Sequence, residues 1–122
     1  MYQIKFYLDN NGRSEIIEYL QQLRKQKNNK DAKIKLSKIT AYIDLLEEYG
    51  LLLGQPYIKH LEDDIWELRP LRDRILFAYL TNNTFILLSQ FIKQTQKTPR
   101  REIERAKRYL KDYKQRGCDI YE

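Results

Sequence analysis

The 122-residue chain has few side chains that could form covalent cross-links or hold metal ions, with one cysteine and one histidine. The lone cysteine, Cys118, forms no intrachain disulfide, and no CxxC or HExxH spacing occurs. The sequence also lacks a glycine-rich phosphate loop and a nucleophile elbow. We therefore expect no metal ion and no cofactor, so any catalysis must use arginine, lysine, carboxylates and a single histidine.

Long apolar runs are also missing from the sequence. The first eight residues alternate and lack the continuous apolar stretch of a signal peptide. No run approaches the roughly 20 apolar residues that a membrane-spanning helix needs. These features predict a cytoplasmic protein without a membrane partner. Because repeats and linker-like tracts are absent, residues 1–122 are expected to form one domain.

The apolar pattern of the first half predicts a strand followed by two helices. Alternation over residues 2–8 is typical of a strand, and helical spacing extends over residues 13–27. A second helix is expected to begin at Asp31, as its cap, and to end at Gly50. A short loop joins the two helices, which predicts an antiparallel hairpin. Residues 51–60 are expected to be irregular.

The second half predicts three strands and a final helix. Strands are expected over residues 65–69, 74–80 and 85–93, and their short connections favour antiparallel pairing. Thr98 and Pro99 are expected to begin the last helix as a capping hydroxyl and a first-turn proline, and Gly117 is expected to end it. Glu104 and Arg108 are spaced to form an i,i+4 ion pair on this helix. The predicted fold is therefore α+β, with the element order β-α-α-β-β-β-α. Strands two and three of this set are apolar on both faces, so helices should cover them.

Positive charge is unevenly distributed along the chain. The net charge is +6, and residues 93–116 alone contain ten basic and three acidic residues. Such clustering is typical of proteins that bind polyanions, although a solvated helix surface is the alternative. Arg69, Arg74 and Lys93 fall at predicted strand ends, where cations can meet a ligand without being buried in the core.

Three segments of the sequence resemble one family. They are WELRP at 66–70, DRILF at 73–77 and FIKQTQKTPRREIERA at 91–106. Together they resemble the phage-derived branch of the HigB toxins within the RelE/ParE superfamily. The chain departs from that pattern at Gln94, where a second lysine is usual. The resemblance implies a RelE-like fold, with a twisted, mainly antiparallel sheet packed by a helical hairpin and a C-terminal helix.

The resemblance also implies a function and partners. The protein would be the toxin of a type II toxin–antitoxin system, a ribosome-dependent endoribonuclease that cleaves translated mRNA and arrests growth. A HigA-like helix-turn-helix antitoxin would neutralise it, and operator DNA would be contacted only through that antitoxin. Metal-independent cleavage agrees with the available side chains, because RNA carries its own nucleophile, the 2′-hydroxyl, and arginine binds phosphate oxygens well.

Candidate site residues follow from the same comparison. Arg69 and Arg74 match the sheet arginines that contact the scissile phosphate, and Lys93 matches a basic position at the end of the last strand. His60 and Glu67 are candidates for proton transfer, although His60 could be a surface residue and Glu67 could simply orient Arg69. Further RNA phosphates are expected to be bound by Lys59, Arg72, Lys97, Arg100 and Arg101.

Other functions remain open at this point. A ParE-like toxin would share the fold but inhibit DNA gyrase without catalytic residues. A non-enzymatic nucleic-acid-binding module would use the basic final helix and would bind without cleaving. That helix could also bind an acidic antitoxin or ribosomal RNA. Trp66 could stack on a base, but its place in an alternating strand favours the core.

Overall fold

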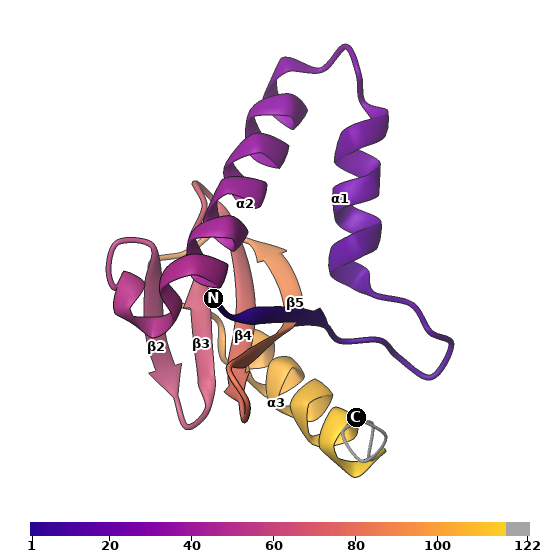
Figure 1. Ribbon diagram of the computed structural model, residues 1–122. Helices are drawn as coiled ribbons and strands as arrows, with labels where there is room; N and C mark the ends of the chain where they lie inside the picture. Colours follow the sequence, from indigo (N-terminus) through magenta and orange to yellow (C-terminus); the bar gives the residue numbers. More distant parts are fainter. Residues whose placement is uncertain (117–122) are drawn as a thin grey trace.

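The computed structural model describes residues 1–116, so Gly117, the expected end of the last helix, and Cys118 lie outside the described residues (Figure 1). The elements in chain order are β1 (Gln3–Phe6), α1 (Glu15–Lys25), α2 (Lys30–Tyr49), the 3₁₀ turn η1 (Gly50–Leu53), β2 (Ile58–Glu62), β3 (Ile65–Leu68), β4 (Asp73–Leu80), β5 (Thr84–Ile92) and α3 (Arg100–Gln115).

The strands form a five-stranded sheet in the order β1-β5-β4-β3-β2. Strands β2 to β5 pair antiparallel with their neighbours, whereas β1 pairs parallel with β5. The predicted α+β fold is confirmed, and the element order differs from the prediction at one strand. Residues 58–60, the end of the stretch expected to be irregular, belong to the edge strand β2. Its exposed Lys59 and His60 hide the apolar alternation that marks a strand, as is common at sheet edges.

Helices cover both faces of the sheet, as predicted for its central strands. The α1–α2 hairpin packs on one face against a core that includes Phe77 and Phe85, both fully buried. Helix α3 packs on the other face against a core that includes Leu76 and Ile86. Neighbours along β4 and β5 thus alternate between the two cores. Within the described residues, no helix is both long and apolar enough to cross a membrane.

The ends of the helical hairpin show which local signals were correct. Ser14 begins α1 by accepting a hydrogen bond from Ile17 N at 3.1 Å. Asn29, and not Asp31, begins α2, because its side chain accepts from Ala32 N at 3.0 Å. Asp31 lies instead in the first turn, where a negative charge is favourable. Gly50 ends α2 as predicted.

Gly50 is the glycine whose conformation the fold requires most strictly. Its φ of 61° and ψ of −147° belong to a region that only glycine adopts easily. An added Cβ would also lie 2.5 Å from the Tyr2 ring. Gly50 therefore allows α2 to end close to the strand that begins the chain.

We predict that Gly50→Ala lowers the free energy of unfolding by about 1–3 kcal/mol or more, because it combines backbone strain with a steric clash. Urea denaturation of the wild type and the variant measures this loss. Gly12→Ala is the control, because Gly12 also has a positive φ but has nothing within 4 Å of its added Cβ. Equal losses in the two variants would show that the contact with Tyr2 does not matter.

Candidate functional site

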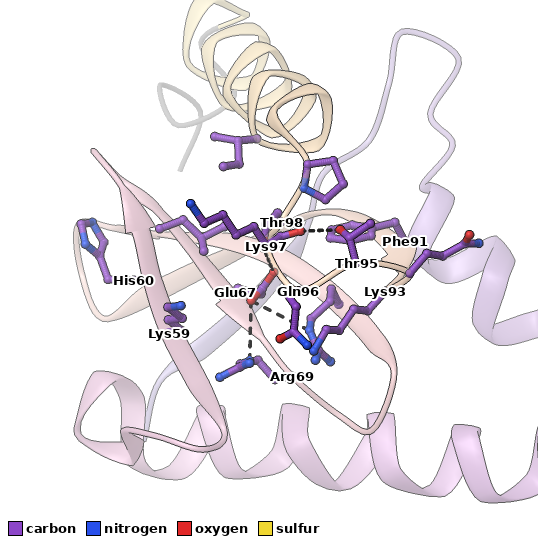
Figure 2. Close-up of a pocket in the computed structure, with 15 residues that line it drawn as sticks. Lys59, His60, Glu67, Arg69, Phe91, Lys93, Thr95, Gln96, Lys97 and Thr98 are labelled. Atoms are coloured by element: carbon purple, nitrogen blue, oxygen red, sulfur yellow. Dashed lines mark hydrogen bonds and ion pairs between the residues drawn. The ribbon is translucent and has the colours of Figure 1, made fainter.

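A buried carboxylate lies at the centre of the candidate site. Glu67 of β3 is only 3% exposed, and its side chain lies on the α3 side of the sheet. Thr98 Oγ1 donates a hydrogen bond to Glu67 Oε2 at 2.5 Å. On the other oxygen, Arg69 Nε lies 3.6 Å and Arg74 Nε 3.9 Å from Glu67 Oε1 (Figure 2). Two cations and a hydroxyl therefore surround one buried negative charge.

Arg74 is held rigidly beneath this carboxylate. It is 6% exposed, and its Nη1 donates hydrogen bonds to the carbonyls of Leu71 and Asp73, both at 2.8 Å. Burial lowers the pKa of the Arg74 guanidinium, and the charge of Glu67 opposes that shift. Arginine keeps its proton even so, because its pKa lies far above neutrality. The site therefore contains a fixed, partly desolvated positive charge.

Arg69 has a hydrogen-bond donor that no atom of residues 1–116 accepts. Its side chain is about one quarter exposed (26%), and its buried Nε has no hydrogen-bond partner within the described protein. The 3.6 Å separation from Glu67 is an ion pair but too long for a hydrogen bond. A buried donor without an acceptor is unusual in a folded protein. The exposed part of the Arg69 side chain can thus meet an anionic ligand while the ion pair with Glu67 holds its buried Nε.

These residues line one hollow at the edge of the sheet. The cavity has a volume of about 240 Å³ and lies between β2, β3, the end of β5 and the loop that leads to α3. Five cations line it together with Glu67, so positive charge dominates. Figure 2 shows Lys93 extending from the end of β5 toward the cluster around Glu67. The cations are Lys59, Arg69, Arg74, Lys93 and Lys97.

The end of β5 is fixed to the turn before β4 by two reciprocal hydrogen bonds. Lys93 N donates to Arg72 O at 2.7 Å, and Arg72 Nη2 donates to Lys93 O at 2.9 Å. Arg72 itself lies outside the main cavity and lines a neighbouring hollow that also contains Arg74 and Lys93. Arg72 thus positions the backbone of Lys93 next to the cavity.

His60 does not join the cluster. It pairs with Trp66 across the β2–β3 ladder, whereas Lys59 pairs with Glu67, so the His60 ring lies on the opposite face of the sheet. That ring packs against Trp66 at 4.9 Å, and its Nε2 lies 2.8 Å from the carbonyl oxygen of Asp63. His60 is among the residues that line the cavity, but the contacts of its ring with Trp66 and Asp63 argue against the proton-transfer role considered from the sequence. Trp66 packs against the hairpin core, as expected.

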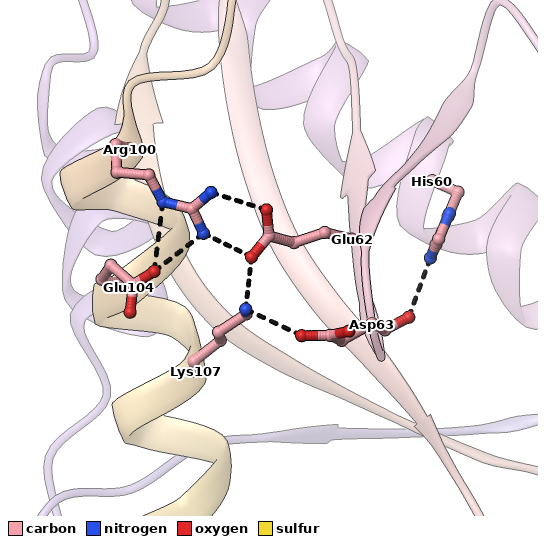
Figure 3. Close-up of polar contacts among 6 residues, drawn as sticks. All are labelled: His60, Glu62, Asp63, Arg100, Glu104 and Lys107. Atoms are coloured by element: carbon pink, nitrogen blue, oxygen red, sulfur yellow. Dashed lines mark hydrogen bonds and ion pairs between the residues drawn. The ribbon is translucent and has the colours of Figure 1, made fainter.

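Arg100 is held by carboxylates and not directed to the cavity. It pairs with Glu62 of β2 and with Glu104 of α3, and Lys107 pairs with Glu62 and Asp63 (Figure 3). The i,i+4 pair expected between Glu104 and Arg108 therefore does not form, because Arg100 takes that carboxylate. Hydrogen bonds from Arg100 and Lys107 lower the pKa of Glu62 to about 2.

Arg101 differs from Arg100 because its side chain is 81% exposed. Its Nε lies 3.8 Å from Glu102 Oε2, which is a loose surface contact. Both arginines line a second, open hollow beside the β5–α3 loop, together with Tyr19 and Gln90. Neither lines the cavity around Glu67, so a role in RNA binding for them would lie outside that cavity.

Thr98 was predicted as a helix cap, and that prediction is wrong. Pro99 stands at the cap position of α3 and makes no side-chain capping bond, while the Thr98 hydroxyl binds Glu67 instead. No local signal distinguishes these two uses of a Thr-Pro pair. The partner of Thr98 is 31 residues away in sequence.

A second buried carboxylate links the hairpin to the site. Asp73 is 1% exposed and accepts hydrogen bonds from Tyr19 OH at 2.6 Å and from Gln90 Nε2 at 3.1 Å. Burial and this bond raise the pKa of Tyr19 above its ordinary value. Because the Asp73 carbonyl accepts from the Arg74 guanidinium, the same residue supports both faces of the sheet at this edge.

Among residues 1–116, no group of three or more His, Cys, Asp or Glu side chains lies close enough together to hold a metal ion.

The chain is similar to one known protein family. A family model, phage-derived protein Gp49-like (DUF891), matches residues 28–111. The chain belongs to this Gp49-like family. It is a family of RelE/ParE-like toxins, associated with toxin–antitoxin systems. No curated protein matches the chain.

We predict that Thr98→Val lowers the free energy of unfolding by about 1–3 kcal/mol, because it removes a hydrogen bond to a buried charge. Urea denaturation measures the loss. Thr95→Val is the control, because the exposed Thr95 hydroxyl binds only the carbonyl of Lys97. A loss no larger than that of the control would show that Glu67 does not need this donor.

We predict that the Glu62 network loses its stabilising effect at low pH. Since the folded protein lowers the pKa of Glu62 from 4.5 to about 2, the ionised form stabilises the fold above about pH 4.5. That contribution decreases as the pH falls from 4.5 toward 2. The difference in urea midpoint between wild type and Glu62→Gln should therefore be largest near pH 6 and should shrink toward pH 2. The exposed Glu48→Gln is the control, and a difference independent of pH would contradict the assignment.

Proposed function

We propose that this Gp49-like protein is a HigB-like toxin that cleaves translated mRNA on the ribosome without a metal cofactor. The observation that supports the proposal is the cavity that five cations line together with the buried Glu67. Arginine and lysine side chains at one edge of the sheet form a site suited to a phosphodiester. A toxin that only blocked gyrase would not require such a pocket.

The reaction that this site suits is an internal transesterification. The 2′-hydroxyl oxygen attacks the adjacent phosphorus, and the bond from phosphorus to the 5′-oxygen breaks. The products are a 2′,3′-cyclic phosphate and a 5′-hydroxyl end. The attacking hydroxyl loses a proton, the leaving oxygen gains one, and extra negative charge develops on the phosphoryl oxygens. Fixed cations that stabilise this charge lower the barrier.

The geometry divides these tasks among the basic residues. The Arg69 side chain is about one quarter exposed, so the solvent-facing part of its guanidinium would bind the phosphoryl oxygens directly. Arg74 is buried and bound to carbonyls, so it would act mainly as a fixed charge behind Arg69. Lys93 and Lys59 also line the cavity, so they would stabilise charge or exchange protons with the reacting oxygens, and Lys97 would bind a neighbouring phosphate.

Glu67 is better placed to position the arginines than to act as a general base. One of its oxygens accepts a hydrogen bond from Thr98, and the other faces both arginines. A base needs a free lone pair within hydrogen-bond distance of the proton that it removes. Glu67 would therefore keep Arg69 and Arg74 together despite their like charges.

Membership of a toxin family also implies a neutralising partner. We infer that this partner is a HigA-like antitoxin with a helix-turn-helix domain, and that operator DNA is bound only through it. Masking the cationic cavity, or blocking entry to the ribosome, would be enough to neutralise the toxin.

The test of this function is primer extension on a reporter mRNA translated in a purified system. We predict cleavage by the wild type only when ribosomes are present. Arg69→Ala and Lys93→Ala should each lower the cleavage rate by roughly 10²–10³, the usual effect of losing one preorganised donor. Lys111→Ala is the matched control, because Lys111 lies on α3 away from this cavity and should have little effect.

Several outcomes would contradict the proposal. Wild-type rates in both cavity variants would show that the cations do not perform the reaction. Inhibition of gyrase in a DNA-supercoiling assay, without mRNA cleavage, would indicate a ParE-like toxin instead. Binding of RNA without cleavage would indicate a non-enzymatic module.

A further inference from the structure

A second concentration of positive charge lies at the distal end of the helical hairpin. Residues 24–38, here called the hairpin tip, include the end of α1, the connecting loop and the first part of α2. Asp31 is the only acidic residue in this segment. Its basic residues are Arg24, Lys25, Lys27, Lys30, Lys33, Lys35 and Lys38.

Nearly all of these cations are exposed and unpaired. Six of the seven are exposed, and none of those six forms an ion pair with any described residue. Lys35 is the exception, since it lies 5.5 Å from the centre of the Tyr19 ring and 3.9 Å from Asp73. The tip therefore presents its charge to the solvent.

Helix α3, which has seven basic and three acidic residues, differs in this respect. Arg105 pairs with Glu15 and Glu102, and Lys107 pairs with Glu62 and Asp63. Arg100 is also paired, which leaves Arg108, Lys111 and Lys114 as the α3 cations without an ion pair among the described residues. Much of the charge that made α3 resemble a polyanion-binding surface is thus neutralised within the protein.

The arrangement of the tip suggests a ligand. Neighbouring lysines repel one another, and acidic residues one turn away would relieve that repulsion. The chain uses such pairs along α3 but not at the tip. Figure 1 shows the hairpin extending well beyond the sheet, so its distal end is accessible from several sides. Unpaired charge on a projecting element favours binding to an extended polyanion.

We infer that the hairpin tip binds the sugar–phosphate backbone of structured RNA, as a second contact separate from the cavity. This inference rests on the proposed function, because it names ribosomal RNA as the partner that the tip would contact while the cavity holds the message. Contacts of lysine with phosphate supply affinity and orientation without reading sequence. The tip would thus dock the enzyme, and the cavity would cleave.

RNA backbone fits the tip better than an acidic protein does. Protein interfaces rely on a buried centre of aromatic, arginine or other large side chains. The tip has one exposed large apolar residue, Ile34, and its other exposed residues are lysine, arginine, asparagine and glutamine together with Asp31 and Ser37. Flexible lysines spread around a rounded end suit the diffuse negative charge of a phosphate backbone.

The experiment compares two triple variants with equal loss of charge. One removes tip charges with Lys27→Gln, Lys30→Gln and Lys33→Gln, and the other removes unpaired α3 charges with Arg108→Gln, Lys111→Gln and Lys114→Gln. The first measurement is the salt dependence of binding to a fluorescent RNA stem-loop. The second is co-sedimentation with purified ribosomes. Circular dichroism and thermal melting confirm that each variant is folded.

The tip variant should lower the slope of log affinity against log salt by about 2–3, because each phosphate contact contributes close to one unit. It should also lose most of its co-sedimentation, whereas the α3 variant should stay close to the wild type. Equal losses in both variants, or no loss in the tip variant, would overturn the inference. Arg69→Ala should still sediment with ribosomes, so a failure of cleavage and a failure of docking can be distinguished.

Discussion

The candidate site depends on one electrostatic constraint, the burial of the Glu67 carboxylate between Arg69, Arg74 and Thr98. Two guanidinium groups repel each other, and a negative charge between them allows both to stay at the same edge of the sheet. A buried carboxylate in turn requires cations and donors, because desolvation of an unpaired charge costs several kcal/mol. Each member therefore stabilises the others, and removal of any one would leave an uncompensated charge or donor.

The residues of this cluster come from elements that are distant in the sequence and that the fold brings together. Strand β3 places Glu67 on the α3 side of the sheet, strand β4 places Arg74 next to it, and the loop before α3 brings Thr98 into contact with it. Asp73 fixes the same edge from the hairpin side through Tyr19 and Gln90. Packing on both faces of β4 and β5 holds this edge rigid, and rigid donors are the ones that contribute most to catalysis.

The sequence predicted the features that depend on local periodicity. Both helices of the hairpin, four of the five strands and the end of α2 at Gly50 follow from spacing and turn residues. The placing of Arg69, Arg74 and Lys93 at strand ends brought them to one edge. Local periodicity could not predict which side chains pair with one another or on which face of the sheet they lie. Glu104 pairs with Arg100 and not with Arg108, and His60 faces away because the register of β2 and β3 decides its side. The edge strand β2 was missed because its polar side chains mask the alternation.

Charge shows the same difference between sequence and structure, because the number of basic residues in a segment does not show which of them form ion pairs. Helix α3 neutralises much of its charge, whereas the cavity and the hairpin tip do not. The central claim is that Arg69 binds a phosphodiester directly while Arg74, fixed behind it, adds its charge to the same site. NMR of arginine Nε–H groups during titration with an uncleavable 2′-O-methyl RNA trinucleotide tests it most directly. Saturable shifts of both the Arg69 and Arg74 resonances are predicted, and titration to millimolar RNA that leaves both unmoved would contradict the account.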